Sequence, residues 1–296
     1  MERMLTMDKN KVYQLGLYEK AMPSHLSWKE KLEATKVAGF DWLEISVDET
    51  EDKLHRLEMD PKFIDEIKTA LKETRVPILT MCLSGHRKYP LGAHDEEIRD
   101  QSLVIMRKAI DLAQELGIRI IQLAGYDVYY ETSDEITQNY FRENLKKAVL
   151  MAAQKGICLG FETMETPFMD TVTKAMRYVS DIQSPYLGVY PDIGNLTNAS
   201  RMTGISVQAD LKQGQGHIYA AHLKEIVEGK YREIPFGTGD THYEAAINAL
   251  MHQGVRLFTA EFWYVGNATW KEDLAFASTY LRAKIESHEL RRKDVK

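Results

Sequence analysis

A glycine recurs between a helix-like stretch and a short apolar run, and this pattern constrains the fold more than any other feature of the chain. It occurs at Gly39, Gly117, Gly156 and Gly254, where each glycine fits the left-handed residue that ends many α-helices. Gly117 and Gly156 are 39 residues apart, and Gly39 and Gly117 are twice that number apart. This interval accommodates one strand, one helix and their loops, so the spacing predicts a chain of repeated strand and helix units.

The apolar runs predict eight parallel strands. Four of them follow the glycines, at 40–46, 118–123, 157–162 and 255–261, and four similar runs lie at 12–18, 76–83, 187–192 and 217–223. Continuous apolar runs are typical of strands that helices cover on both faces of a parallel sheet. Helix starts are marked as well: the segments 27–30 and 132–135 fit capping boxes, and Asp60-Pro61 fits an N-cap followed by a helix-opening proline.

Eight alternating units favour a closed (β/α)8 TIM barrel over an open doubly wound sheet. The length of 296 residues suits one barrel, since such domains usually have about 250 residues. We therefore predict a single barrel domain over residues 1–296, which ends in a charged, solvated helix and tail from Arg282 onward. No glycine-rich phosphate loop follows the first run, which disfavours a dinucleotide-binding fold.

Charge and hydropathy exclude several classes of protein. The net charge of −6 argues against nucleic-acid binding, which depends on lysine and arginine contacts to phosphate. No apolar run reaches the roughly 18 residues of a membrane span, and residues 1–12 lack the apolar core of a signal peptide. Cys82 and Cys158 lie in apolar segments and are expected to be buried, reduced thiols. Together these features predict a cytoplasmic protein without membrane or nucleic-acid partners.

Polar residues close the last four apolar runs, at Glu162, Asp192, His222 and Glu261. Active sites of α/β barrels lie at the C-terminal ends of the strands, and neighbouring strands are only about 4.8 Å apart. The four side chains can therefore meet at one point. Three carboxylates and one imidazole suit a divalent Mn, Co, Mg or Zn ion, and three buried acids need such a counter-charge. Taken singly, each residue also has a structural interpretation, as a helix cap or a hydrogen-bonded core histidine.

At these residues the chain resembles the L-ribulose-5-phosphate 3-epimerase (L-xylulose-5-phosphate 3-epimerase) group of the xylose-isomerase-like TIM-barrel superfamily, which serves bacterial ascorbate and pentose pathways. The resemblance covers nearly the whole chain. Its matching stretches are 15–20, 44–50, 81–87 with 90–92, 121–130 and 190–196. Related epimerases of unphosphorylated ketoses carry a histidine three positions after the metal-binding aspartate, where this chain has Asn195. The phosphopentose group is therefore the better match.

The resemblance implies an activity and a set of site residues. The activity is metal-dependent 3-epimerisation of a ketopentose 5-phosphate, from L-xylulose 5-phosphate to L-ribulose 5-phosphate, through an enediolate. The implied metal ligands are Glu162, Asp192, His222 and Glu261, which are the four residues selected from the strand ends. Glu162 and Glu261 would transfer the C3 proton on opposite faces, while Asp192 and His222 would mainly hold the metal. The group further implies a homodimer.

Residues near the strand ends are candidates for binding the phosphorylated ketose. His86 and Arg87 follow the third strand in a basic loop, while Lys224 and Arg232 follow the seventh; any of them can contact a phosphate. Glu165 and Asn195 are candidates for the sugar hydroxyl groups.

Three other functions use a similar barrel. An aldose-ketose isomerase of the hexulose-6-phosphate or hydroxypyruvate type would need the same metal but would move hydrogen between C1 and C2. An apurinic endonuclease would need a histidine-rich zinc cluster, and this chain has too few histidines at its strand ends. A non-catalytic sugar-binding barrel would bind its ligand without turnover.

Overall fold

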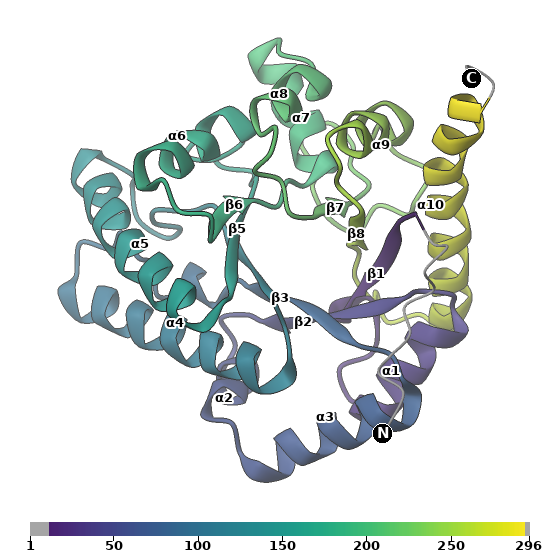
Figure 1. Ribbon diagram of the computed structural model, residues 1–296, viewed down its shortest axis with the longest axis horizontal. Helices are drawn as coiled ribbons and strands as arrows, with labels where there is room; N and C mark the ends of the chain where they lie inside the picture. The colour runs from purple at the N-terminus through teal and green to yellow at the C-terminus, as the bar shows by residue number, and fades with distance from the viewer. Residues whose placement is uncertain (1–11, 294–296) are drawn as a thin grey trace.

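A computed structural model describes residues 12–293, in which eight parallel strands surround a central axis (Figure 1). The strands are β1 (Gln14–Tyr18), β2 (Trp42–Val47), β3 (Ile78–Leu83), β4 (Ile120–Ala124), β5 (Cys158–Glu162), β6 (Leu187–Val189), β7 (Ala221–Leu223) and β8 (Leu257–Ala260). They pair in the order β6-β5-β4-β3-β2-β1-β8-β7. Two parallel bridges, Val189 to Ile218 and Asp192 to His222, join the β6 and β7 segments. The predicted (β/α)8 barrel is thereby confirmed.

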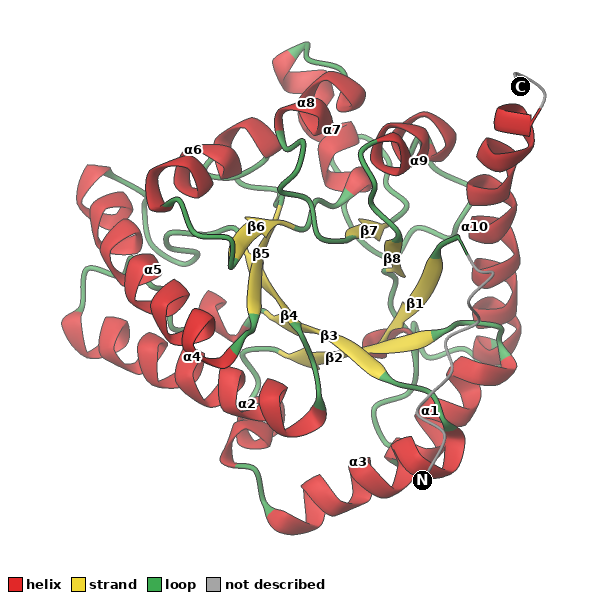
Figure 2. Cartoon of the chain, viewed as in Figure 1, coloured by secondary structure: helices red, strands yellow, loops and turns green. Residues whose placement is uncertain are grey.

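Helices form a ring outside the strands, as Figure 2 shows. They are α1 (Trp28–Val37), α2 (Glu51–His55), α3 (Pro61–Thr74), α4 (Glu96–Leu116), α5 (Glu135–Lys155), α6 (Val172–Ile182), α7 (Ile193–Thr203), α8 (Val207–Gln213), α9 (Tyr243–His252) and α10 (Trp270–Lys293), with short 3-10 turns η1 (Glu19–Ala21), η2 (Arg56–Glu58) and η3 (Gly85–Arg87). Among residues 12–293, no helix is long and apolar enough to span a membrane. The opening stretch 1–11 and the end of the predicted tail, 294–296, lie outside the described residues.

The predicted helix boundaries rest on local backbone chemistry. The four recurring glycines all have positive φ, which is 88° at Gly39, 76° at Gly117, 67° at Gly156 and 90° at Gly254. A side chain is disfavoured in this left-handed conformation, so glycine ends each helix without strain. The capping box of Ser27 and Glu30 is present at the start of α1. Asp60 caps α3 ahead of the helix-opening proline.

The start of α5 differs from the prediction of a capping box over 132–135. The N-cap is Asp134, whose carboxylate accepts the backbone N–H of Thr137 while the Thr137 hydroxyl accepts the N–H of Asp134. The predicted box would have placed the cap at Thr132, two residues earlier. The buried carboxylate of Asp127 accepts the hydroxyls of Ser133 at 2.7 Å and of Thr137 at 2.6 Å, and Asp134 between them becomes the cap.

The strands are buried on both faces, as their apolar composition predicts. All six residues of β2 are buried. Its Trp42 lies directly against β1, where a Cβ atom added to Gly16 would be 2.3 Å from the indole ring, so this contact requires glycine. Of the two free cysteines, Cys82 is buried as predicted, whereas Cys158 is only half-buried because it stands at the first, less covered position of β5.

Candidate metal centre and active site

The side chains of Glu162, Asp192, His222 and Glu261 meet at the C-terminal end of the barrel. Glu162 is the last residue of β5 and His222 lies in β7, while Asp192 and Glu261 follow β6 and β8. One ligand atom from each residue lies within 4.8 Å of those of the other three. All four residues are at least 95% buried. The parallel arrangement of the strands brings these sequence-distant groups to one point.

Neighbouring polar groups fix the orientation of this cluster. His222 donates its Nε2–H to Glu44 at 2.7 Å, so its Nδ1 faces Glu162 Oε1 at 3.2 Å and Glu261 Oε2 at 3.5 Å. Glu162 also accepts a hydrogen bond from Gln122 Nε2 in the neighbouring strand β4. These side chains are thus held by polar groups on other strands of the barrel.

Asp192 has two functions in the structure because its two oxygens face different partners. Its Oδ1 accepts the backbone N–H of Asn195 at 2.7 Å and so caps α7. Its Oδ2 lies 3.0 Å from the ammonium group of Lys224, which is also 3.3 Å from Glu261 Oε2. A helix cap therefore presents one carboxylate oxygen to the cluster.

Burial and mutual repulsion give the acids of the cluster different proton affinities. Burial, and then the charge of Glu261, raises the pKa of Glu162. Burial also raises the pKa of Asp192, against the opposing effect of Lys224. Burial alone would raise the pKa of Glu261 too, but Lys224 and His222 lower it below its ordinary value. Three adjacent acids share too little positive charge to ionise together.

The donor set fits a divalent cation. Asp192 Oδ2 and Glu261 Oε2 are buried, and among the described residues they share ion pairs with the one ammonium group of Lys224 but accept no hydrogen bond of good geometry. Buried carboxylate oxygens normally accept hydrogen bonds, and a metal ion would supply a further shared partner for both. Three carboxylates with one imidazole nitrogen are ligands that divalent Mn, Co, Mg and Zn ions accept. The residues present therefore form a candidate metal centre.

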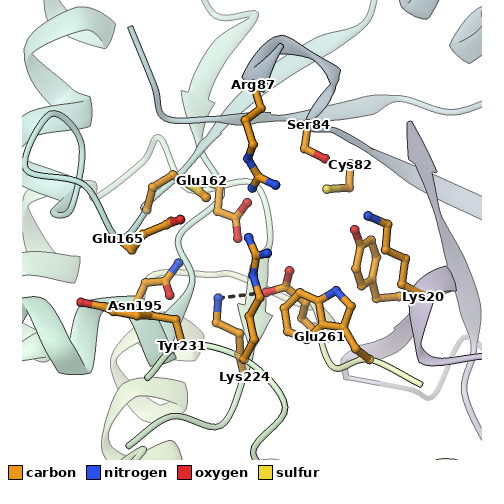
Figure 3. Close-up of a pocket in the computed structure, with 14 residues that line it drawn as sticks. Lys20, Cys82, Ser84, Arg87, Glu162, Glu165, Asn195, Lys224, Tyr231 and Glu261 are labelled. Atoms are coloured by element: carbon orange, nitrogen blue, oxygen red, sulfur yellow. Dashed lines mark ion pairs between the residues drawn. The ribbon is translucent and has the colours of Figure 1, made fainter. Parts of the chain in front are cut away.

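A polar cavity opens above the cluster (Figure 3). In the figure Arg87 enters from one side, whereas Lys224 and Glu261 lie across from it, with Glu162 between them. The lining residues are Tyr18, Lys20, Cys82, Ser84, Arg87, Glu162, Met164, Glu165, Asn195, Lys224, Tyr231, Arg232, Glu261 and Trp263. Five of the six residues predicted to contact substrate are in this set, namely Arg87, Glu165, Asn195, Lys224 and Arg232.

His86, the sixth predicted substrate residue, does not line the cavity. The residue is 94% buried, and its Nε2 donates to the backbone carbonyl of Ser102 in α4 at 3.1 Å. Because Gly85–Arg87 form a 3-10 turn, successive side chains point in different directions, so Arg87 reaches the cavity and His86 packs against the helix layer. The structure therefore assigns His86 a packing contact.

Sequence reasoning did not select several residues of the site. Lys20 and Trp263 lie just past β1 and β8, where the strand-end criterion would have found them had it been applied to every strand. Glu44 interrupts an apolar strand, which is a visible signal of a buried polar contact. Tyr231 lies in a long irregular loop and carries no such signal.

The buried ring of His86 should make folding stability depend on pH. Burial lowers the pKa of His86 from 6.5 to about 4, although its bond to Ser102 opposes the shift. Between those values the unfolded chain binds a proton that the folded chain excludes, so stability is present above pH 6.5 and is lost as the pH falls. Between pH 7 and pH 5 the native chain should lose about 2 kcal/mol more of its unfolding free energy than a His86→Gln variant does. Urea unfolding at both pH values measures this, and equal losses in the two proteins would contradict it.

The fold and the site together define a class. Eight parallel strands, with acidic and imidazole groups at the ends of the last four, describe a (β/α)8 barrel with a candidate metal site at its C-terminal rim. Residues 32–280 match the family model described as Xylose isomerase-like TIM barrel, and the chain belongs to that family.

Within that family the chain belongs to the L-ribulose-5-phosphate 3-epimerase group, which consists of isomerases. The chain is 40% identical to L-ribulose-5-phosphate 3-epimerase UlaE of Escherichia coli O8 (strain IAI1) over 272 residues. This match covers 92% of this chain and 94% of the relative. Solved structures that share the fold include the following two. A D-tagatose 3-epimerase-like protein has a TM-score of 0.77 at 18% identity, over 94% of this chain and 99% of that one. An L-ribulose 3-epimerase has a TM-score of 0.74 at 17% identity, over 96% of this chain and 98% of that one.

Proposed function

We propose that the chain interconverts L-xylulose 5-phosphate and L-ribulose 5-phosphate by exchanging the proton at C3, with one divalent metal ion. The observation that carries the proposal is the convergence of Glu162, Asp192, His222 and Glu261 within 4.8 Å. Its support is the 40% identity to a relative named as the corresponding 3-epimerase. A bound divalent cation would supply Lewis acidity toward the ketose oxygens and neutralise the negative charge that develops when the proton leaves.

The two glutamates are proposed to move the proton. Inversion at carbon requires removal from one face and return on the other. Glu162 ends β5 and Glu261 follows β8, two strands that do not pair with each other, and both residues line the cavity. One carboxylate would take the C3 proton, and the other, initially protonated, would return a proton to the opposite face. Their roles exchange with the direction of the reaction.

Asp192 and His222 are proposed to bind the metal ion in a fixed orientation, and Lys224 beside them is proposed to balance charge. Asp192 is anchored through its bond to the start of α7, and His222 is anchored by Glu44. Lys224 is 95% buried and already lies between Asp192 and Glu261. We therefore assign it to charge balance at the reacting end of the substrate rather than to the phosphate.

The substrate phosphate is proposed to bind the cations at the outer part of the cavity, Arg87, Arg232 and Lys20. The guanidinium of Arg87 lies over the rings of Tyr126 and Tyr129, 5.7 and 4.6 Å from their centroids. Stacking holds a guanidinium in one plane, which favours two-pronged contact with a phosphate. Arg232 lies over one ring, that of Trp263 at 5.5 Å, whereas Arg87 lies over two, so we take Arg87 as the main phosphate contact.

Two polar residues are proposed to contact the sugar hydroxyl groups. Asn195 donates its amide N–H to Thr163 O at 2.7 Å. Its buried Oδ1 has no hydrogen-bond partner among the described residues and can accept a hydrogen bond from a sugar hydroxyl group. Glu165 accepts the hydroxyl of Tyr126 at 2.7 Å, which turns its carboxylate toward the cavity that it lines.

The reaction itself can be followed in D₂O. The metal-loaded chain is incubated with L-ribulose 5-phosphate, and NMR should show deuterium entering at C3 as the L-xylulose epimer forms. Unphosphorylated L-ribulose is the matched control and should react far more slowly, because it lacks the group that Arg87 and its neighbours bind. Elemental analysis should find about one metal ion per chain.

Other outcomes identify the alternatives. Label confined to C1 would indicate an aldose-ketose isomerase. Binding of the sugar phosphate without any exchange would indicate a non-catalytic barrel. Either result would overturn the proposed epimerisation while leaving the fold unchanged.

A further inference from the structure

Glu44 is an acid in the interior of the barrel, where bulky branched apolar residues are usual. It lies in the middle of β2, and its relative exposure is 0%. It does not line the cavity, so it lies on the interior side of the candidate metal centre, away from the substrate. Burying an ionised carboxylate is expensive unless several donors compensate its charge.

Three donors provide that compensation. Glu44 Oε1 accepts His222 Nε2–H at 2.7 Å. Glu44 Oε2 accepts the hydroxyl of Thr80 at 2.5 Å and that of Tyr190 at 3.1 Å. The Tyr190 hydroxyl is itself 2.6 Å from the hydroxyl of Thr259. A polar layer from four strand segments thus crosses the barrel interior and ends on one ring nitrogen of His222.

We propose that Glu44 is the positioning residue of the metal centre, a role that rests on the proposed function. By accepting Nε2–H, Glu44 holds the proton of the neutral imidazole on that nitrogen and leaves the Nδ1 lone pair available. Nδ1 is the nitrogen that faces Glu162 and Glu261. A carboxylate behind a ligating histidine fixes its ring orientation and strengthens it as a ligand.

A purely structural role for Glu44 would have different consequences. Removing a hydrogen bond buried in the barrel would then change the free energy of unfolding and leave metal affinity in the folded protein unaltered. Metal affinity is therefore the decisive measurement, and it needs neither substrate nor turnover.

Two substitutions separate charge from hydrogen bonding. Glu44→Gln keeps the shape and an acceptor oxygen, whereas Glu44→Met keeps the approximate volume and removes the acceptor. We expect the Kd for Zn²⁺, measured by competition with a chromophoric chelator, to rise about 10-fold in the first and about 100-fold in the second. The matched control is Asp210→Asn, which removes a buried carboxylate outside the cluster that accepts the first backbone N–H groups of α6 and should leave the Kd within about twofold.

The nitrogen that binds the metal can be observed directly. In the Zn²⁺ complex of the native chain, ¹⁵N-histidine NMR should show His222 bound through Nδ1 with a slowly exchanging proton on Nε2, and in Glu44→Gln that proton should exchange faster. The inference is overturned if His222 binds through Nε2, or if either Glu44 variant, folded by circular dichroism, binds Zn²⁺ as the native chain does. If Glu44→Met does not fold, Glu44→Gln decides. Failure of the native chain to bind metal would instead refute the proposed function.

Discussion

Replacing Glu261 by glutamine should lower kcat for C3 epimerisation by about 10³-fold. Glu261 is buried in the cluster and faces the cavity, and the amide cannot accept or return a proton. Loss of a positioned general acid or base costs between about 10²-fold and 10⁴-fold. The amide is also a poorer ligand than a carboxylate, so metal affinity should fall as well. Assays at saturating metal separate the two effects.

A variant of the second glutamate and a control variant complete the experiment. Glu162→Gln should show a loss of the same size, because inversion requires both groups. Asp210→Asn removes a buried acid on the outer helix layer and should retain native turnover when assayed in the same way. Unchanged exchange at C3 in Glu261→Gln, measured by deuterium incorporation, would remove this residue from the proposed mechanism.

Substituting Glu19 by glutamine should lower the free energy of unfolding by about 3 to 5 kcal/mol. The side chain of Glu19 is 1% exposed and binds three cations, with Lys31 and Lys53 at 2.8 Å and Arg56 at 2.6 Å. It also accepts the backbone N–H of Ser46 at 2.9 Å. The amide would leave three cations at the mouth of the barrel without their counter-charge.

The pH dependence of this effect gives a second test. Burial alone would raise the pKa of Glu19, but Arg56, Lys53 and Lys31 hold it well below 4.5. The stabilisation is therefore present above about pH 4.5 and is lost as the pH falls through the lower folded pKa. The difference between native chain and variant, from urea unfolding, should shrink in acid.

Lys53→Met is the matched control for Glu19→Gln. Two cations still neutralise Glu19 in that variant, so a much smaller loss of stability is expected. An equal loss in the two variants, or none in Glu19→Gln, would contradict the proposed role of the carboxylate.

The fold could be predicted because its signals are local. A glycine with positive φ after a helix, an apolar run of strand length and a capping residue each act over a few positions. Their repetition along the chain then requires a parallel sheet with eight strands. The error at α5 arises where a contact outside the helix intervenes, because the bonds of Ser133 and Thr137 to Asp127 left Asp134 as the cap.

The four cluster residues were predictable for a related reason. Glu162, Asp192, His222 and Glu261 each end an apolar run, and parallel strands present their carboxyl ends at one rim. The position of a residue at the end of a strand was thus sufficient to place it at the rim of the barrel. No such rule exists for loops, whose side-chain directions depend on what they pack against.

By itself, then, the amino-acid sequence determined the number of strands, their parallel order and which residues stand at the rim, because these follow from short-range backbone preferences and hydrophobic burial. Only the tertiary structure decided which side chains face the substrate cavity and which face the protein. Arg87 enters the cavity while the adjacent His86 turns to α4, and Glu44 meets His222 across 178 positions of sequence. Such contacts depend on the closure of the barrel and on the packing around each ring. They join residues that are distant in the sequence, so no short stretch of chain determines them.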